Sequence, residues 1–444
     1  MKTVRPADGL VVQESVSLEA GVWTLSEGIR FGAPRVRLDG SQATLVCADE
    51  NVVALSVDDA EGCSIEGVRI LGGKHGVRAR RCKDLIIRKC DISGTAEERA
   101  NTIFLDIWRR AEEAYGSAVL LIECEGAEVE GNLLQHQQNG ILSYHCRDLR
   151  VLSNQCNYNS GFGIHLYGTC DSLFEANSCD YCCRFEPREG GLHFGHMGAD
   201  AAGFLAVHGS SRNRFIRNTA RLGGDGFFLA GMTPDGDHLG CDDNLFEEND
   251  GSLSPNVAFE ATFCRGNVFR RNFADRCNFG FWCGFSSDFL IEENRMVHNR
   301  QAGIAVENGV NFIVRQNTFQ ACGHGVLLWT KPWRGAGQAN ATAAGWLIEA
   351  NRFLRNGVGI RIAANQDHGI RPLQAEESSS IAPHSHRILR NDIQDNRIGI
   401  ELVGTKHNFV RENILNANVE ANLRISDADE NDIANNLGAR GAYL

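Results

Sequence analysis

The chain has 444 residues, of which 43% are hydrophobic and 23% are charged. This balance excludes both a disordered chain and a bundle of membrane helices. Forty-four Lys and Arg against 56 Asp and Glu give a net charge of −12. That charge disfavours nucleic acid, an anionic membrane surface or a polyanionic polymer as the main partner, so we expect a soluble folded protein with a neutral partner.

Residues 1–50 are predicted to form the opening coils and the cap of a repeat structure, because a stack of repeats needs a covered end. Apolar alternation at 22–26 and 36–40 indicates short strands. The opening segment Met1–Gly9 has no apolar core of a secretory signal, and no stretch reaches the roughly 20 apolar residues of a membrane helix. We therefore expect a cytoplasmic chain, or a secreted one if a signal has been removed.

A repeat of 22 or 23 residues runs from about residue 50 to residue 436. Within each unit a Gly-led apolar strand is followed by a short apolar run that ends in Asn. Such runs are too short for helices and suit three strands per coil. The leading glycines are Gly140, Gly163, Gly203, Gly226, Gly280, Gly303, Gly325, Gly359 and Gly399, with Ala258 and Ala421 in two further places. The recurring asparagines include Asn177, Asn218, Asn249, Asn272, Asn294 and Asn413.

This repeat resembles the parallel β-helix repeats of the pectin-lyase-like superfamily over nearly the whole chain. The resemblance implies an all-β fold, a single right-handed parallel β-helix domain over residues 1–444 with three strands per coil. It also implies that the recurring Asn side chains stack into a structural ladder along the axis. The superfamily contains lyases, hydrolases, epimerases and non-catalytic proteins, so the fold by itself does not select a function.

Five insertions interrupt the repeat, at 95–117, 182–202, 232–240, 331–345 and 364–386. The first begins with a capping box at 95–98 and is predicted to form one short amphipathic helix on the wall of the solenoid, with roles in trimerisation or in lining a cleft as alternatives. Its apolar residues at helical spacing are Ile103, Phe104, Ile107, Trp108 and Ala111. The other four leave or enter the Gly-led strands, so they are expected to wall a groove.

The sixteen cysteines follow the same period. Cys124 and Cys146 are 22 residues apart, and Cys156 and Cys179 are 23 apart. Stacked positions lie about 4.8 Å apart in neighbouring coils, which permits some disulfides geometrically. We expect instead reduced, inward-facing side chains that act as small hydrophobic residues.

The outward positions of the Gly-led strands are rich in aromatic residues. Counting the glycine as zero, positions +1 and +3 face the core and positions +2 and +4 face outward. Aromatic rings beside a few polar groups are typical of a sugar-binding platform. The alternative is that the insertions cover these rings, which then only extend the core. The predicted substrate-binding residues of this face are Tyr144, His165, Tyr167, Phe228, Trp282, Trp329 and Arg361.

Glu260 is the candidate general acid, because its column neighbours are Phe228 and Trp282, and enclosure between rings raises the pKa of a carboxyl group. The candidate base or nucleophile is Glu307 or Asp225, each with its Cα roughly 11 to 12 Å from that of Glu260. Side chains can close this gap to the roughly 6.5 to 9.5 Å of an inverting glycosidase, so inversion is favoured. The alternatives are a solvated Glu307 and an Asp225 that caps a turn.

The insertion before Asp200 adds polar groups to the expected groove. His193, His196 and Asp200, with His208 on the next strand, are predicted to hydrogen-bond substrate, with a zinc site or a plain loop as alternatives. Asp235 and its neighbouring aspartates are predicted to form a solvated turn rather than a calcium site. We predict no metal and no cofactor.

These patterns predict a glycoside hydrolase that acts on a neutral or weakly charged oligo- or polysaccharide by general acid/base catalysis. A polysaccharide lyase or uronate epimerase is the first alternative, but it needs cations against substrate carboxylates, and this face offers Arg361 without a neighbouring Lys. A non-catalytic glycan-binding β-helix is the second alternative. Carbohydrate is the expected partner, not nucleic acid or membrane, and the chain is a monomer or a homo-oligomer, a trimer included.

Overall fold

The computed structural model describes residues 1–99, 103–184, 201–332, 340–364, 366–367, 371–372, 382–428, 430–438 and 442–443. It divides into two compact units, Met1–Phe227 and Phe228–Leu444. The boundary falls inside strand β23 (Asp225–Ala230), so no loop separates the units along the chain. Each unit is a stack of coils made of short parallel strands, as the repeat predicts.

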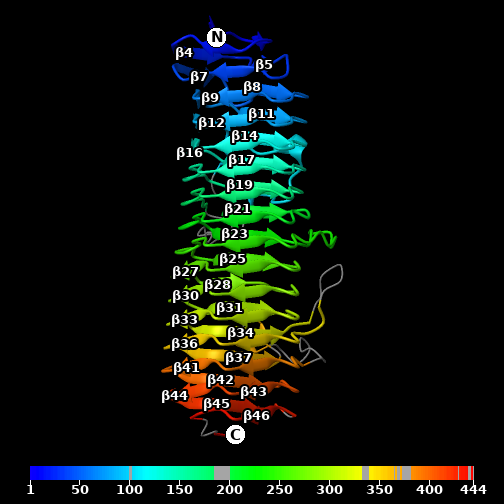
Figure 1. Cartoon of the computed structure of the whole chain (residues 1–444), viewed down its shortest axis with the longest axis vertical. Coiled ribbons are helices and arrows are strands. Elements are labelled where there is room, and N and C mark those ends of the chain that lie inside the picture. Colours follow the sequence, from blue (N-terminus) through cyan, green and yellow to red (C-terminus); the bar gives the residue numbers. More distant parts are fainter. Residues whose placement is uncertain are drawn as a thin grey trace. The chain divides into compact units, whose positions relative to one another are not determined.

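In the first unit the Gly-led strands form one parallel sheet, labelled along the stack in Figure 1. Two further sheets of mainly three-residue strands complete each coil. The long-strand sheet contains β2 (Val11–Val12), β5 (Ile29–Phe31), β8 (Val53–Asp58), β11 (His75–Arg80), β14 (Ser117–Ile122), β17 (Asn139–Tyr144), β19 (Phe162–Tyr167) and β21 (Ala202–Val207). The second sheet contains β1 (Lys2–Val4), β3 (Val16–Leu18), β6 (Arg37–Asp39), β9 (Ser64–Glu66), β12 (Ile86–Arg88), β15 (Glu128–Glu130), β18 (Arg150–Leu152), β20 (Leu173–Glu175) and β22 (Arg214–Ile216). The third contains β4 (Gly21–Leu25), β7 (Ala43–Cys47), β10 (Arg69–Leu71), β13 (Asp91–Ser93) and β16 (Leu133–Gln135).

The second unit repeats this arrangement of three parallel sheets. Its long-strand sheet contains β25 (Val257–Thr262), β28 (Phe279–Trp282), β31 (Ala302–Glu307), β34 (His324–Thr330), β37 (Val358–Ala364), β42 (Ile398–Val403), β45 (Ala421–Ser426) and β47 (Ala442–Tyr443). The second sheet contains β24 (Leu245–Glu247), β26 (Val268–Arg270), β29 (Leu290–Glu292), β32 (Ile313–Arg315), β35 (Leu347–Glu349), β40 (Arg387–Leu389), β43 (Phe409–Arg411) and β46 (Asp432–Ala434). The third contains β27 (Phe273–Asp275), β30 (Arg295–Val297), β33 (Thr318–Gln320), β36 (Arg352–Leu354), β41 (Asp392–Gln394) and β44 (Ile414–Asn416). Within the 364–386 insertion, β38 (Gln366–Asp367) pairs antiparallel with β39 (Arg371–Pro372).

The predicted asparagine ladder is confirmed in both units. In the second unit Asn272 Nδ2 donates to Asn294 Oδ1 at 3.0 Å, and Asn294 Nδ2 donates to Asn317 Oδ1 at 3.1 Å. Each amide also satisfies a backbone carbonyl of an earlier coil, as Asn294 does with Phe269 O at 2.9 Å. The ladder therefore pairs buried polar groups at the corner where each coil turns.

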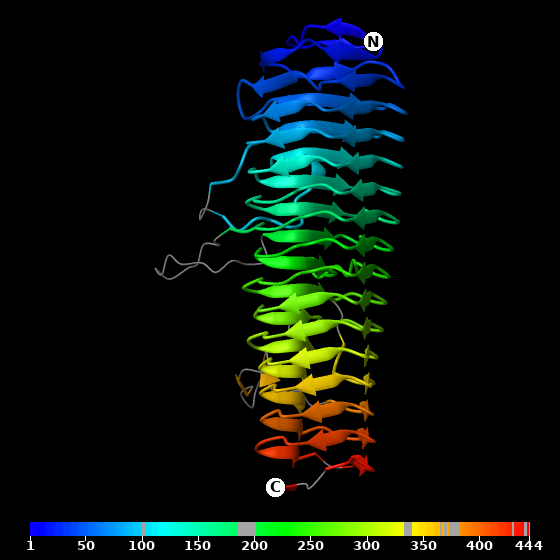
Figure 2. The ribbon, with the colours of Figure 1, turned by 60° about the vertical axis from the view of Figure 1, so that its left-hand side comes forward.

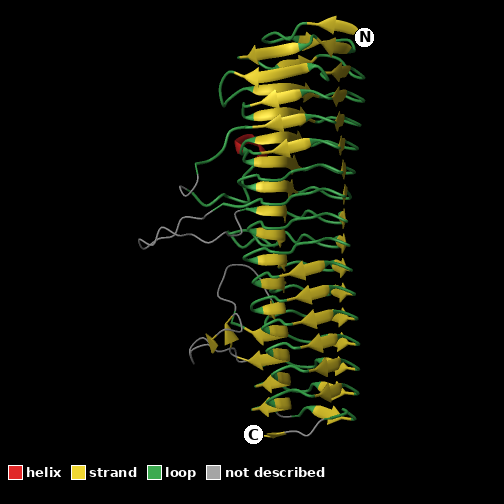
Figure 3. Cartoon of the chain, turned by 90° about the vertical axis from the view of Figure 1, so that its left-hand side faces the viewer, coloured by secondary structure: helices red, strands yellow, loops and turns green. Residues whose placement is uncertain are grey.

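The insertion at 95–117 does not form the predicted amphipathic helix. Its described residues, 95–99 and 103–117, contain the three-residue 3₁₀ helix η1 (Ala111–Glu113), drawn in red in Figure 3, and otherwise irregular chain. Ile103 and Phe104, two members of the expected apolar stripe, are exposed, whereas Leu105 and Tyr115 are buried. The prediction was wrong because contacts with the solenoid wall decide which side chains are buried, and they override the helical spacing.

The cysteines are free thiols at all sixteen positions, and most of them are buried. The predicted stacks are present: the Cys124 backbone N–H donates to Cys146 Sγ at 3.4 Å, and the thiols of Cys156 and Cys179 are hydrogen-bonded. Burial raises the pKa of the Cys277 thiol to about 12. Such thiols stay protonated and behave as hydrophobic residues. Among the described residues, no helix is long and apolar enough to span a membrane.

Candidate functional site

In the first unit, the outward face of strands β17 and β19 is covered by the chain itself. Tyr144 and His165 are each 2% exposed, and Tyr167 is also buried. The covering segment is 103–117, because His165 Nε2 lies 3.3 Å from Ile107 O. Figure 2 shows this segment returning to the coils. These rings therefore lie under a strap of chain and do not face solvent. This agrees with the alternative interpretation, in which insertions cover the aromatic rings.

The far end of the same face is more open. The rings of Tyr167 and His208 stack with centroids 4.2 Å apart, and His145 lies against both. His208 is half-buried, and its pKa is lowered first by burial and then by His145. His193, His196 and Asp200, predicted to join this region, lie outside the described residues. Their role in substrate binding stays a prediction.

In the second unit, the strand register agrees with the column geometry inferred from the repeat. Glu260 pairs with Trp282, and Trp282 pairs with Ala305, so these three residues occupy one column. Glu307 lies two residues beyond Ala305 and pairs with Trp329 on the next strand. Glu260 and Glu307 are thus two coils and two residues apart on one face, a Cα separation of roughly 11 to 12 Å.

The two glutamates differ in their access to solvent. Glu260 and Trp282 are half-buried, whereas Glu307 is only 6% exposed. The Glu307 carboxyl lies over Gly284: a Cβ at that glycine would be 2.6 Å from Glu307 Cδ. Only a glycine leaves this space, since real Cβ atoms essentially never approach so closely. Gly284 fills position +4 of the outward column, and its role in placing Glu307 is not evident from the repeat pattern.

Cys283 follows β28, the strand that lies between those of Glu260 and Glu307. Burial raises the pKa of its thiol, and the nearby charges of Glu260 and Glu307 raise it further. Cys283 follows Trp282 and is itself fully buried. Glu260 on β25 and Glu307 on β31 thus belong to the two strands that flank β28.

An aromatic cluster lies beside this pair. The Trp282 ring lies edge-on to Phe279 at 4.8 Å and to Trp329 at 5.7 Å. Trp329 is fully buried, and its Nε1–H has no hydrogen-bond partner among the described residues. Phe228 is also buried, at 6% exposure. Of the predicted aromatic platform in this unit, Trp282 is the ring that remains partly accessible.

Arg361 is held in an ion pair, and Asp225 is buried. Arg361 forms an ion pair with Glu401, which also accepts from Arg424 at 3.3 Å. An arginine held in this way is less available to a substrate carboxylate. Asp225 is fully buried at the end of the first unit, and its catalytic role stays a prediction. Among the residues that the structure describes, no group of three His, Cys, Asp or Glu is arranged to hold a metal ion.

The predicted solvated turn at 232–240 is an exposed hairpin. Met232 and His238 form an antiparallel bridge, and Asp235 and Asp237 are exposed to solvent. His238 Nε2 lies 2.9 Å from Phe263 O on a neighbouring coil of the second unit. This contact holds the hairpin against the edge of the long-strand sheet.

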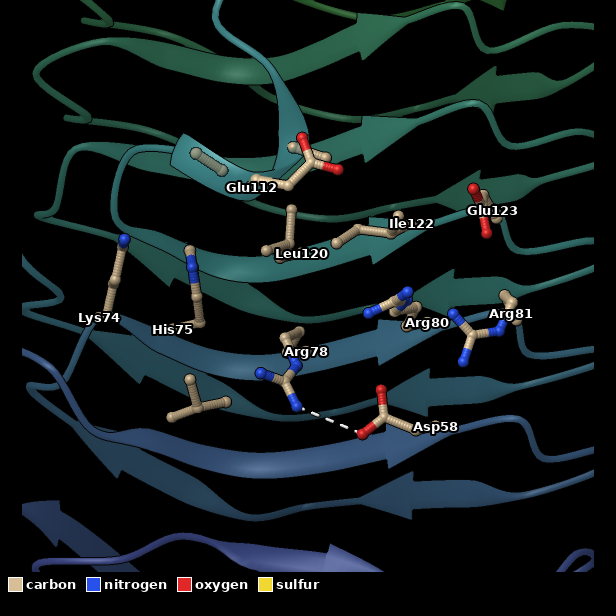
Figure 4. A pocket seen from close by; sticks show the side chains of 13 residues that line it. Asp58, Lys74, His75, Arg78, Arg80, Arg81, Glu112, Leu120, Ile122 and Glu123 are labelled. Carbon is tan, nitrogen blue, oxygen red and sulfur yellow. Dashed lines mark hydrogen bonds and ion pairs between the residues drawn. The ribbon is translucent and has the colours of Figure 1, made fainter.

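A groove in the first unit was missed by the sequence analysis. Its cavity volume is about 390 Å³, and it lies over strands β8, β11 and β14, with η1 forming one wall (Figure 4). Arg78 and Arg80 of β11 point into it, with Lys74 at one end and Asp58 below. Arg78 and Arg80 fill the +2 and +4 positions after Gly76, so extending the outward columns toward the N-terminus finds them.

His75 is the buried polar group of this groove. It is 4% exposed, and its Nδ1 lies 3.0 Å from Ser117 Oγ on the next strand. Burial, followed by the charges of Lys74 and Arg78, lowers the pKa of His75 to about 3. The imidazole is therefore neutral at physiological pH and contributes a hydrogen-bonding group without a charge.

Comparison with known families assigns the fold. The sequence pattern of the family described as the right-handed β-helix region matches residues 109–251 and 223–333, which together make just over half of the chain. The chain belongs to the right-handed β-helix family. This membership confirms the fold predicted from the Gly and Asn repeat.

Solved right-handed β-helix structures align with this family member along most of its length. The periplasmic alginate epimerase AlgG is 11% identical, with 94% of this chain and 79% of that chain covered and a TM-score of 0.44. The A-module of the mannuronan C-5 epimerase AlgE6 of Azotobacter vinelandii is 10% identical, with 97% and 92% covered and a TM-score of 0.43. A variant of the catalytic domain of a GH87 α-1,3-glucanase in complex with tetrasaccharides is 11% identical, with 94% and 65% covered and a TM-score of 0.43. Among curated proteins, none matches this chain. Similarity at this level concerns the β-helix fold alone.

Proposed function

We propose that this β-helix is a glycoside hydrolase for a neutral or weakly charged glycan, with Glu260 and Glu307 as its acid/base pair. The observation that carries the proposal is the placement of two glutamates of unequal burial on the outward face of β25 and β31, with Trp282 on the strand between them. A pair of carboxyl groups in two environments is what glycosidic-bond cleavage requires.

The spacing of the pair favours inversion of configuration. Two glutamate side chains can reduce a Cα separation of roughly 11 to 12 Å to the roughly 6.5 to 9.5 Å that leaves room for a water molecule. The roughly 5 Å of a retaining enzyme requires a closer approach. An inverting enzyme needs one carboxylic acid to protonate the leaving oxygen and one carboxylate to activate water.

The burial of each glutamate suggests its role. The sequence analysis assigns the acid to Glu260, but Glu307 is the more buried of the two. Exclusion of water favours the neutral form of a carboxyl group, so Glu307 is the better general acid. The half-buried Glu260, beside the accessible edge of Trp282, is better placed to hold a water molecule as the base.

The test is hydrolysis of a glycan panel, followed by chromatography of the products, with the variants Glu260→Gln and Glu307→Gln. We expect each to lower kcat on the natural glycan by about 10² to 10⁴. The acid variant, Glu307→Gln, should keep much of its activity on an aryl glycoside with a good leaving group, whereas the base variant should lose both activities. The control is Glu247→Gln, on the second sheet of the same unit, which should retain full activity.

Two results would contradict the proposal. Wild-type rates in both folded glutamine variants would exclude the pair. Products that carry a new carbon–carbon double bond, detected by ultraviolet absorbance, would indicate a lyase instead. The anomeric form of the first product, read by NMR, distinguishes inversion from retention.

A further inference from the structure

The groove over β8, β11 and β14 lies outside the glutamate pair and is built differently. We infer that it binds a small saccharide that carries one acid group, a carboxylate or a phosphate, held by Arg78 and Arg80. This inference concerns the first unit alone and does not depend on the proposed glycosidase. It stands on four features of the groove: its shape, its cations, its neutral hydrogen-bonding group and its apolar floor.

The groove is large enough for a small ligand. Its volume of about 390 Å³ is within the range of small-molecule sites. Its walls come from strands β8, β11 and β14 and from the strap that carries η1, which covers one side. Sites on a rigid sheet hold their side chains in fixed positions. The volume suits one or two sugar rings rather than a long polymer.

The cations of the groove are only partly neutralised. Arg78 and Arg80 are two residues apart on one face of β11, roughly 7 Å along the strand. Arg78 pairs with Asp58 at 3.2 Å, but its Nε is buried and has no hydrogen-bond partner among the described residues. Lys74 and Arg80 make no ion pair with any residue in the described part of the chain. The Arg80 guanidinium and the Lys74 ammonium are thus available to an anion, whereas Arg78 is shared with Asp58.

The remaining charges do not cancel this set. Arg81 also lines the groove, but Asp59 holds it through two hydrogen bonds of 2.6 Å. Glu112 and Glu123 lie across from β11, on the side of Leu120 and Ile122 (Figure 4). The cations line the β11 side, with Asp58 beside Arg78, and Glu112 and Glu123 lie on the opposite side. A ligand with an acid group at one edge and hydroxyl groups at the other matches this asymmetry, because hydroxyls donate to carboxylates.

The floor and the buried histidine fit a sugar ring. Leu120 is 2% exposed and forms an aliphatic floor with Ile122, against which the C–H face of a pyranose can pack. His75, held by Ser117, is neutral and offers a hydrogen-bonding group to a hydroxyl at the Lys74 end. A simple inorganic anion would leave both features unused.

Isothermal titration calorimetry of the full chain tests this inference with three probes: glucuronate, glucose 6-phosphate and glucose. We expect an acid-bearing probe to bind more tightly than glucose, and the tighter of the two acids identifies the preferred group. Arg80→Gln should weaken that binding by roughly tenfold or more, because it removes hydrogen bonds from a charged donor. Arg80→Lys should recover part of it, since Lys keeps the charge but not the fork of donors.

The matched control is Arg69→Gln, an exposed arginine on the third sheet of the same unit that pairs with Asp91 at 3.3 Å. It should leave the affinity unchanged. Lys74→Gln is the second variant and should also weaken binding. Equal affinity for glucose and both acids, or equal loss in the Arg80 and Arg69 variants, would overturn the inference. The hydrolysis of the glycan panel is a separate measurement, so failure of either proposal is seen independently.

Discussion

Gly284 is the residue on which the position of the Glu307 carboxyl depends. Its missing side chain leaves the space that this buried carboxyl fills. A side chain at this position competes with the carboxyl itself rather than with the backbone, because the nearest atoms are Cδ, Oε1 and Oε2 of Glu307. The glycine is therefore a positioning residue for the proposed acid.

Gly284→Ala should displace the Glu307 carboxyl, lower kcat and cost about 1 to 3 kcal/mol of unfolding free energy through overpacking. A double-mutant cycle with Glu307→Ala measures whether the clash is with this side chain. In the Glu307→Ala background the Gly284→Ala change should cost little, because the space is then empty. An unchanged cost in that background would assign the glycine a backbone role.

His386 makes the stability of the fold depend on pH. It is fully buried, and burial, with the nearby His384, lowers its pKa to about 3. The unfolded chain binds a proton at a histidine near pH 6.5. Between pH 6.5 and about 3 the unfolded state is therefore the more protonated one, so this contribution to stability is complete above pH 6.5 and is lost as the pH falls.

We expect acid to destabilise the protein by at most about 1.4 kcal/mol per pH unit for this histidine. His386→Asn removes the titratable imidazole. The Asn side-chain oxygen can accept from the backbone N–H of Trp346, and the backbone N–H of residue 386 still donates to Asn408 Oδ1. Urea denaturation at several pH values should show a flatter dependence in this variant. The exposed His407→Asn is the control and should keep the wild-type slope.

Among the elements of the fold, the asparagine ladder contributes most clearly to coil stability. An interior member such as Asn294 donates to two backbone carbonyls and to the next Asn, and it accepts from the previous one. Its removal leaves several buried groups unpaired, each at a cost of about 1 to 3 kcal/mol. The last member, Asn436, is half-buried and has no later Asn to pair with among the described residues.

Asn294→Ala should lower the free energy of unfolding by about 3 kcal/mol, and Asn436→Ala by about 1 kcal/mol. Chemical denaturation of both variants checks the difference. The prediction is that Asn294→Ala costs more unfolding free energy than Asn436→Ala. The comparison is matched because both substitutions remove an Asn side chain from the same ladder. Equal costs would show that burial of the ladder interior is not what stabilises it.

At the scale of the whole molecule, the two units raise the question of how many transitions the chain has when it unfolds. The sequence predicts one continuous domain over 1–444, and β23 carries the boundary between the units without a linker. Coils in a repeat protein stabilise one another through nearest-neighbour contacts. Because no linker interrupts the coils along the chain, we expect calorimetry to show a single transition. Two resolved transitions would contradict the single domain.

The charge of the whole molecule and that of the groove have opposite signs. The chain carries a net charge of −12, yet β11 presents Arg78 and Arg80 at one groove. The net charge alone therefore favours a neutral partner for the whole surface. Only the placement of charges in space shows a local site for an anion.

The repeat by itself determined the coils, because a glycine and an asparagine recur at fixed places in each 22- or 23-residue unit and each coil obeys the same local rules. For the same reason the register of Glu260, Trp282 and Glu307 was predictable, since stacking in parallel strands follows from the period. What covers the outward face was decided by the tertiary structure. The path of 103–117 buries Tyr144 and His165 and walls the cationic groove, and that path depends on contacts between distant segments rather than on helical spacing within the insertion.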